Sequence, residues 1–282
     1  MKPRTILAFW LFSLLSAGAA LAEPVAMVTD IAGGVSIAGT QKKIELLAYL
    51  EPDMTLQIEA GAHLSVTFFA SSVEYRFTGP VKIKIQQDRI GSGPGKSEMR
   101  VIPLTQASTA KKFTAAQRES VAQAAYEMRA ARPGLRLNDP VDSRLTGDDV
   151  SFSWEGPRTD KGYDLTLFDS RNNVLYRTSL MGNIWRPAEG LLEAGKLYAW
   201  EIRAEIGNGE MLTARAGFSV SDSAAAKAIR SQRPQAGASF SERVLYAIFL
   251  EENGFKYDAR RIWQELARER PDDAVVKERS IR

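Results

Sequence analysis

Two long stretches of the sequence alternate apolar and polar residues with a period of two, and this feature limits the possible fold most strongly. In the first stretch, residues 25–104, the alternation is clear at Leu64–Phe68 and Val81–Ile85. In the second, residues 138–222, aromatic residues take the apolar positions, as at Phe152–Trp154. Successive side chains of a strand point to opposite faces, so the pattern predicts strands with one buried face. The chain is therefore expected to be mainly β.

Two other segments have the helical period instead. Segment 114–132 begins with a capping box, in which Thr114 and Gln117 each satisfy a backbone N–H, and predicts an amphipathic linking helix. In segment 222–282, apolar residues recur on one face of two helical runs separated by Asn253-Gly254. We expect these runs to form an antiparallel helical hairpin.

These patterns predict a mainly β fold with helical additions, in five parts. The parts are a signal peptide at 1–22, a β domain at 23–104, a helical linker at 105–138, a β-sandwich at 139–221 and a helical hairpin at 222–282.

The first 22 residues have the parts of a secretory signal peptide. A short basic start precedes the apolar run Thr5–Leu15, and Ala20-Leu21-Ala22 forms an A-x-A cleavage signal before Glu23. Cleavage after Ala22 removes two of 37 basic residues and none of 34 acidic ones, which leaves a net charge of +1. A net charge this small gives the protein as a whole no electrostatic attraction to nucleic acid. We expect a periplasmic or secreted protein, with an uncleaved membrane anchor at the N-terminus as the alternative.

Catalytic and metal chemistry is limited by the absence of cysteine and the presence of one histidine. Disulfides, thiolate metal sites, cysteine nucleophiles and multi-histidine metal centres are excluded. A Ser-His-Asp set would have to use His63, which follows Gly61-Ala62 at a predicted strand start, and the sequence has no Gly-x-Ser-x-Gly elbow. We predict no catalytic residue, no metal and no cofactor. A hydrolase centred on His63 is the enzymatic alternative.

Residues 28–102 resemble the FecR domain, a periplasmic sensing module of bacterial envelope proteins. The likeness is carried by Gly33-Gly34-Val35 in a first hairpin, Leu56-Gln57-Ile58 ahead of the reversal at Gly61-Ala62-His63, and the strand after Gly79-Pro80. Such domains often have Asp-Gly where this chain has Ala70–Val73. The best-known members signal to a sigma factor through a cytoplasmic segment, and here only Met1–Arg4 precede the apolar run. The resemblance therefore implies the fold and not sigma-factor regulation.

The second β region resembles a fibronectin type III or related immunoglobulin-like sandwich. The residues that carry the likeness are Phe152-Ser153-Trp154, Tyr163-Asp164-Leu165 and Leu197–Ile202. Many functions share this sandwich, so the resemblance implies fold alone. Trp154 and Trp200 are expected in the core between the sheets.

The C-terminal hairpin resembles one tetratricopeptide unit, through Leu245-Tyr246-Ala247, Glu252-Asn253-Gly254, Asp258-Ala259, Trp263 and Pro271. A solenoid needs about three such repeats to bury a continuous core. The remaining apolar surface must therefore meet either the sandwich or another molecule. We predict a partner-binding surface made of Leu245, Ile248, Phe249, Ile262, Trp263 and Leu266.

Together these features predict an exported, non-enzymatic envelope protein that binds another envelope protein as an adaptor or sensor component. Recognition of an envelope polysaccharide or peptidoglycan is the alternative function. Exposed aromatic residues on the β regions would favour the polysaccharide, and an apolar groove on the hairpin would favour a protein partner.

Overall fold

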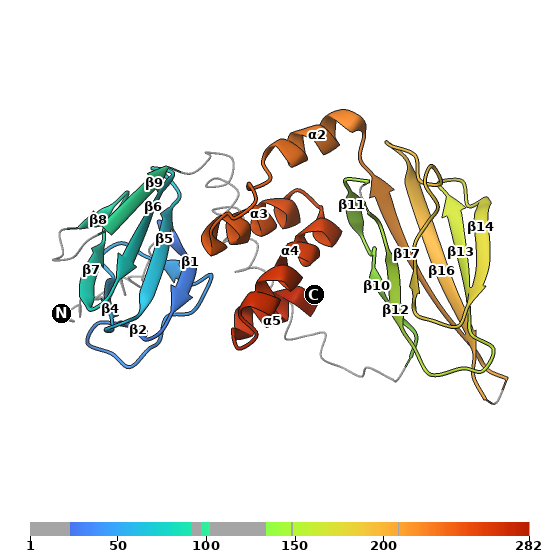
Figure 1. Ribbon diagram of the computed structural model, residues 1–282, viewed down its shortest axis with the longest axis horizontal. Helices are drawn as coiled ribbons and strands as arrows, with labels where there is room; N and C mark the ends of the chain where they lie inside the picture. Colours follow the sequence, from blue (N-terminus) through green and yellow to red (C-terminus); the bar gives the residue numbers. More distant parts are fainter. Residues whose placement is uncertain (1–22, 92–96, 102–133, 148, 208, 282) are drawn as a thin grey trace, which may run out of the picture.

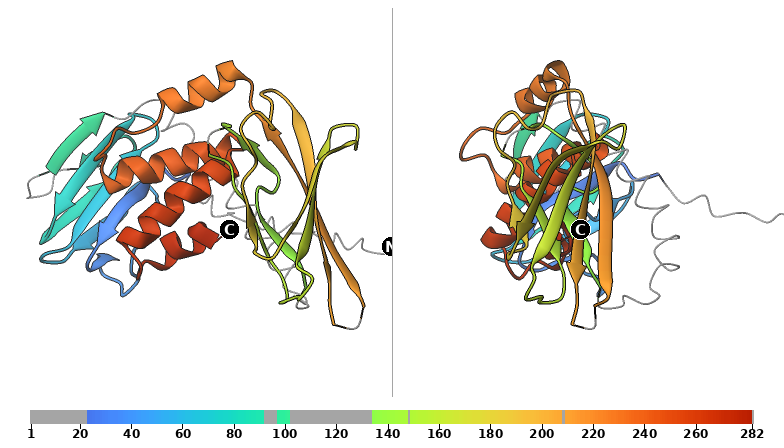
Figure 2. Two further views of the ribbon diagram at one scale, coloured as in Figure 1. Left: turned by 45° about the vertical axis from the view of Figure 1, so that its right-hand side comes forward. Right: turned by 90° about the vertical axis from the view of Figure 1, so that its right-hand side faces the viewer.

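The computed structural model describes residues 23–91, 97–101, 134–147, 149–207 and 209–281. It contains a first β domain (residues 23–101), a second β domain (134–221) and a helical unit (222–281). The helical unit lies between the two β domains (Figure 1), and the turned views of Figure 2 show the same order. The mainly β fold with helical additions is confirmed.

The first β domain is built of two sheets that enclose an apolar core. One sheet has the strand order β3-β1-β5-β6-β9 and contains β1 (Ala26–Ala32), β3 (Tyr49–Leu50), β5 (His63–Phe68), β6 (Val73–Thr78) and β9 (Ser97–Val101). The other has the order β2-β4-β7-β8 and contains β2 (Val35–Ile37), β4 (Thr55–Ile58), β7 (Val81–Ile85) and β8 (Ile90–Gly91). In β7 the two lysines are exposed and the three apolar residues are buried, as the alternation predicts.

Three glycine-containing corners carry the chain from one sheet to the other. The predicted hairpin at Gly33-Gly34 is wrong, because β1 and β2 pair with strands of different sheets. The predicted reversal at Gly61 is present as a turn in which the Ala62 N–H donates to the Glu59 carbonyl at 3.1 Å, but it joins β4 and β5, which also belong to different sheets. The corners pack tightly against one another. A Cβ on Gly79 would lie 1.9 Å from the carbonyl oxygen of Glu59. Glycine at positions 33 and 79 therefore permits close approach between the corners, whereas Gly61 takes a positive φ in its turn.

The second β domain is also a two-sheet sandwich. Its smaller sheet, in the order β10-β12-β15, contains β10 (Arg136–Asp139), β12 (Phe152–Glu155) and β15 (Ile184–Trp185). Its larger sheet, in the order β11-β17-β16-β13-β14, contains β11 (Ser143–Leu145), β13 (Tyr163–Asp169), β14 (Val174–Leu180), β16 (Leu197–Glu205) and β17 (Met211–Val220). Trp154 and Trp200 are fully buried between the sheets, which confirms their predicted place.

The predicted boundary before residue 139 is wrong by a few residues, because β10 already begins at Arg136 and pairs with β12. The predicted helix at 114–132 and the predicted signal peptide at 1–22 lie outside the described residues.

The helical unit contains α2 (Ser223–Ser231), α3 (Phe240–Glu252), α4 (Lys256–Glu269) and α5 (Ala274–Ile281). Ser239 and Glu242 form a capping box at the start of α3, and Gly254 takes a positive φ between α3 and α4. The predicted hairpin is confirmed as α3 and α4. The additional helix α5 was not predicted. It begins because the Asp273 carboxylate accepts the backbone N–H groups of Val275 and Val276.

Among the described residues, no helix has the length and apolar character required to cross a membrane.

Candidate functional site

The six residues predicted to bind a partner lie in the core that the helical unit shares with the first β domain. Leu245, Ile248, Phe249, Trp263 and Leu266 are buried, and Ile262 is partly buried. The side chains that complete this core from the first β domain are those of Met27, Leu46, Leu47 and Phe69. This corrects the prediction of an external docking surface, because the chain itself covers the apolar face of the hairpin.

Arg270, at the end of α4, joins the helical unit to the first β domain. Its guanidinium lies 3.5 Å from the ring centroid of Phe240, pairs with the Asp30 carboxylate at 2.7 Å and donates to the Ile31 carbonyl at 2.9 Å. Burial opposes ionisation of Asp30, but hydrogen bonds and charge from His63 and Arg270 outweigh it and lower the pKa of this carboxyl. Asp30 is therefore held as a carboxylate in the contact between β1 and α4.

His63 begins β5, as predicted, and its side chain is 43% exposed. Its Nε2 lies 3.4 Å from Asp30 Oδ1, the same oxygen that Arg270 binds. The His63–Asp30 pair therefore belongs to a contact between elements. The hydrolase alternative gains no support from this arrangement, because the carboxylate is already shared with an arginine.

The contact between the helical unit and the second β domain is mostly polar. Asp258 accepts hydrogen bonds from the Thr146 hydroxyl at 2.9 Å and the Thr146 backbone N–H at 3.3 Å. The Tyr257 hydroxyl accepts from the backbone N–H of Ser151 at 2.9 Å and donates to the Asp149 carbonyl at 3.0 Å. The Tyr257 ring enters the apolar core of the second β domain. Side chains at the start of α4 thus fix the position of β11 and the loop after it.

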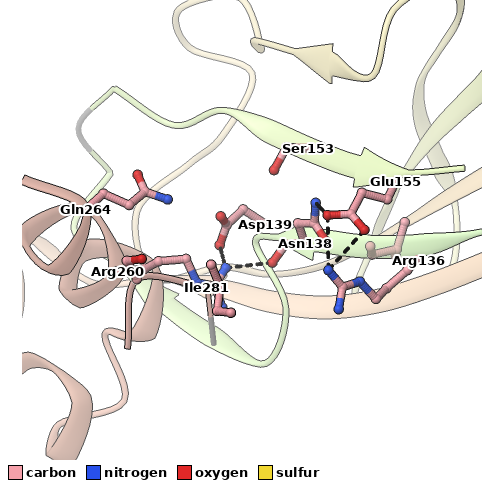
Figure 3. Close-up of a pocket in the computed structure, with 10 residues that line it drawn as sticks. Arg136, Asn138, Asp139, Ser153, Glu155, Arg260, Gln264 and Ile281 are labelled. Carbon is pink, nitrogen blue, oxygen red and sulfur yellow. Dashed lines mark hydrogen bonds and ion pairs between the residues drawn. The ribbon is translucent and has the colours of Figure 1, made fainter. Parts of the chain in front are cut away.

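A polar cleft of about 500 Å³ lies where the smaller sheet of the second β domain meets α4 and α5 (Figure 3). Arg136 donates both to Glu155 Oε1 at 3.0 Å and to Oε2 at 3.1 Å. Arg260 pairs with Asp139 and donates to the Asn138 carbonyl at 2.7 Å. Burial raises the pKa of Asp139 even though Arg260 favours its charged form. The charges of the cleft largely neutralise each other, so the cleft does not select an ion of either sign.

No group of three or more His, Asp or Glu side chains suitable for a metal ion occurs in the part of the chain that the structure describes.

An exposed apolar surface lies along one edge of the second β domain, and sequence reasoning missed it. We call it the β14 edge surface and define it as Val174, Leu175, Tyr176, Met181 and Ile184. The exposed fractions of Val174, Met181 and Ile184 are 51%, 72% and 60%. The run Val174-Leu175-Tyr176 between Asn173 and Arg177 was the available signal, because three consecutive apolar residues cannot all face one core.

No protein-family model matches the sequence, and no curated protein matches it either. Among solved structures, the chain is similar to the crystal structure of CopC from Methylosinus trichosporium OB3b, with 15% sequence identity and a TM-score of 0.26. The match covers 31% of this chain and 94% of that chain. A TM-score this low carries no argument about fold or function.

Proposed function

We propose that this protein is an exported, non-catalytic component of a bacterial cell envelope that binds another envelope protein as an adaptor or sensor component. In this proposal the first β domain is FecR-like, the second is fibronectin type III-like, and the helical unit is a tetratricopeptide-like connector between them. The signal-peptide pattern of residues 1–22 supports export. The observation that carries partner binding is the β14 edge surface.

Large contiguous apolar patches are unusual on solitary soluble proteins and mark interaction sites. The β14 edge surface brings five of the exposed large apolar side chains of the described residues into segment 174–184, on β14, on the connection that follows it and on β15. In Figure 1, β14 lies at the outer side of the second β domain, away from the helical unit and the first β domain. A partner could therefore reach this surface without separating any described parts of the chain.

A protein partner fits this surface better than a polysaccharide. Carbohydrate sites typically offer exposed aromatic faces, whereas Trp154, Trp185, Trp200 and Trp263 are all buried. Tyr176 is the aromatic residue among the exposed large apolar side chains of the described segments. The other four members of the β14 edge surface are aliphatic or methionine side chains, which favour an apolar protein partner.

Site-specific photo-crosslinking in the native envelope tests the proposal. A photo-reactive amino acid at Val174 samples the β14 edge surface, and the same residue at Met211 is the matched control. The two positions lie in one domain and are exposed to almost the same extent, 51% and 52%. We expect a crosslinked envelope protein from position 174 and none from position 211. Absence of any protein crosslink at 174, or equal products at both positions, would contradict the proposal.

Export is tested separately by intact-mass measurement of the protein recovered from the envelope. The expected mature N-terminus is Glu23. Recovery of the protein from the cytoplasm with Met1 still present would contradict export.

A further inference from the structure

Strand β14 is the longest strand at a sheet edge in the described part of the chain. It has seven residues, whereas the edge strands β2, β3, β8, β9, β10, β11 and β15 have between two and five. Within the described residues, β14 pairs with β13 on one side and with no strand on the other. An unpaired edge presents a row of backbone N–H and C=O groups that can pair with another strand.

The two faces of β14 differ in chemistry. Tyr176 lies opposite Leu167 of β13, faces the core side and stacks on Trp185 with ring centroids 5.2 Å apart. Arg177 lies opposite Thr166, so its exposed side chain is on the outer face of the sheet. The register shifts at the start of β14, so the regular part of the edge runs from Tyr176 to Leu180. A strand added there would meet an apolar ring on one face and a cation on the other.

Charge excludes a second copy of this chain as the favoured occupant. Segment 174–186 contains Arg177 and Arg186 and no acidic residue. Both arginines are exposed, and neither forms an ion pair within the described residues. Pairing β14 with β14 of a second copy would place two Arg177 side chains on the same face of neighbouring strands, and like charges on neighbouring strands destabilise a sheet. Lone charges on edge strands commonly oppose such self-association.

We propose that β14 accepts, as an added strand, an extended segment of a different protein that alternates apolar and acidic residues. An apolar side chain of that segment would cover Tyr176, and an acidic side chain would face Arg177. Backbone pairing along an edge supplies affinity, and alternate side chains supply specificity. This inference rests on the proposed function, because it names the kind of partner segment that the β14 edge surface binds.

Charge reversal is the first test. In the protein with the photo-reactive residue at Val174, Arg177→Glu should reduce the crosslink yield by about tenfold, since it replaces an attraction with a repulsion. Arg158→Glu is the matched control, because Arg158 is an exposed arginine of the same domain and the change in net charge is identical. The control should crosslink normally. Equal losses in both variants, or no loss in Arg177→Glu, would overturn the inference.

Backbone methylation of the partner segment is the second test. Mass spectrometry of the crosslink identifies the segment, which is then synthesised together with two versions N-methylated at adjacent residues. Adjacent N–H groups of a strand point in opposite directions, so one version should lose binding by at least about tenfold and the other should retain it. Loss in both versions or in neither would overturn strand addition.

The outcomes also separate this inference from the proposed function. A crosslinked protein that fails the charge and methylation tests would overturn the inference and leave the proposed function standing. A product with twice the mass of the chain would identify a second copy and overturn the inference. A lack of any protein crosslink at position 174 would overturn the proposed function itself.

Discussion

The helical unit meets its two β neighbours through contacts of different kinds. Toward the first β domain, buried apolar residues of α3, α4 and α5 form one cluster with Met27, Leu46, Leu47 and Phe69. Toward the second β domain, the contact consists mainly of hydrogen bonds and ion pairs of Tyr257, Asp258, Arg260 and Arg261, with the Tyr257 ring as its apolar part.

This difference has consequences for stability. Apolar burial is roughly proportional to area, and a shared core couples the stability of the elements that form it. Polar contacts are directional and depend on pH and ionic strength. We therefore expect the helical unit and the first β domain to unfold as one cooperative body. The second β domain should be the part whose attachment is adjustable, and it is also the part that presents the β14 edge surface.

The largest expected effect comes from Met27→Ala, which removes a fully buried side chain of β1 from the shared core. The cost should be about 2–5 kcal/mol, and hydrogen exchange of α3 amides should accelerate although the change lies in the β domain. Leu165→Ala, in the core of the second β domain, is the control and should leave α3 exchange unchanged. If both variants accelerate the hydrogen exchange of α3 amides equally, the helical unit is not coupled more closely to the first β domain than to the second.

A smaller effect is expected from Tyr257→Phe, which deletes the hydroxyl between Ser151 N–H and the Asp149 carbonyl. The loss should be about 1–2 kcal/mol and should weaken the attachment of the second β domain. Hydrogen exchange at Ser151 should accelerate while α3 amides stay protected. Tyr163→Phe is the control, because its hydroxyl bonds within the second β domain to the Pro157 carbonyl. If α3 protection falls in Tyr257→Phe, the two contacts are not independent.

The two contacts should respond to acid in opposite directions. The pKa of Asp30 is lowered, so its stabilising contribution is complete above the ordinary carboxyl pKa of 3.8 and is lost as the pH falls through the lowered value. The pKa of Asp139 is raised, so protonation favours the folded form and its unfavourable charge burial is relieved as the pH falls through the raised value.

Thermal unfolding measured from neutral to acid pH checks this opposition. Asp30→Asn should flatten the acid loss of Tm for the first β domain and the helical unit, and Asp139→Asn should leave that loss in place. Identical pH profiles for the two variants would contradict the assigned directions.

The smallest effect is expected from Arg261→Ala. The Arg261–Asp149 pair joins α4 to the second β domain at 3.1 Å, but both side chains are exposed. Such pairs contribute about 0–1 kcal/mol and are screened by salt. A double-mutant cycle with Asp149→Ala at low and high salt measures the coupling. A coupling that persists at high salt would show that this pair is more than a surface contact.

Much of the fold could be predicted, because local patterns carry the information. Alternation located strands such as β7 and β13, and it placed Trp154 and Trp200 in the core. The helical period and the Asn253-Gly254 stop located α3 and α4. Helix α5 was missed because Pro271 suggested an end, whereas Asp273 supplies a new N-cap two residues later.

The candidate site could be predicted less well. The six hairpin residues were recognised as apolar, but their role was assigned to the wrong neighbour, since the first β domain covers them. The β14 edge surface went unrecognised because exposure of Val174 and Tyr176 depends on β14 being the last strand of its sheet. Strand order arises from pairing between segments that are distant in the chain, so the local sequence of a strand says little about its place in the sheet.

Periodicity in the sequence was enough to predict the mainly β character, the helical hairpin and the buried face of strands such as β7, because it reports the side chains that avoid water. What each buried face packs against depends on the tertiary structure. The Arg270 contacts with Asp30 and Ile31 join residues more than 200 positions apart. Such contacts depend on the packing of whole domains, so no local pattern near either residue could specify them.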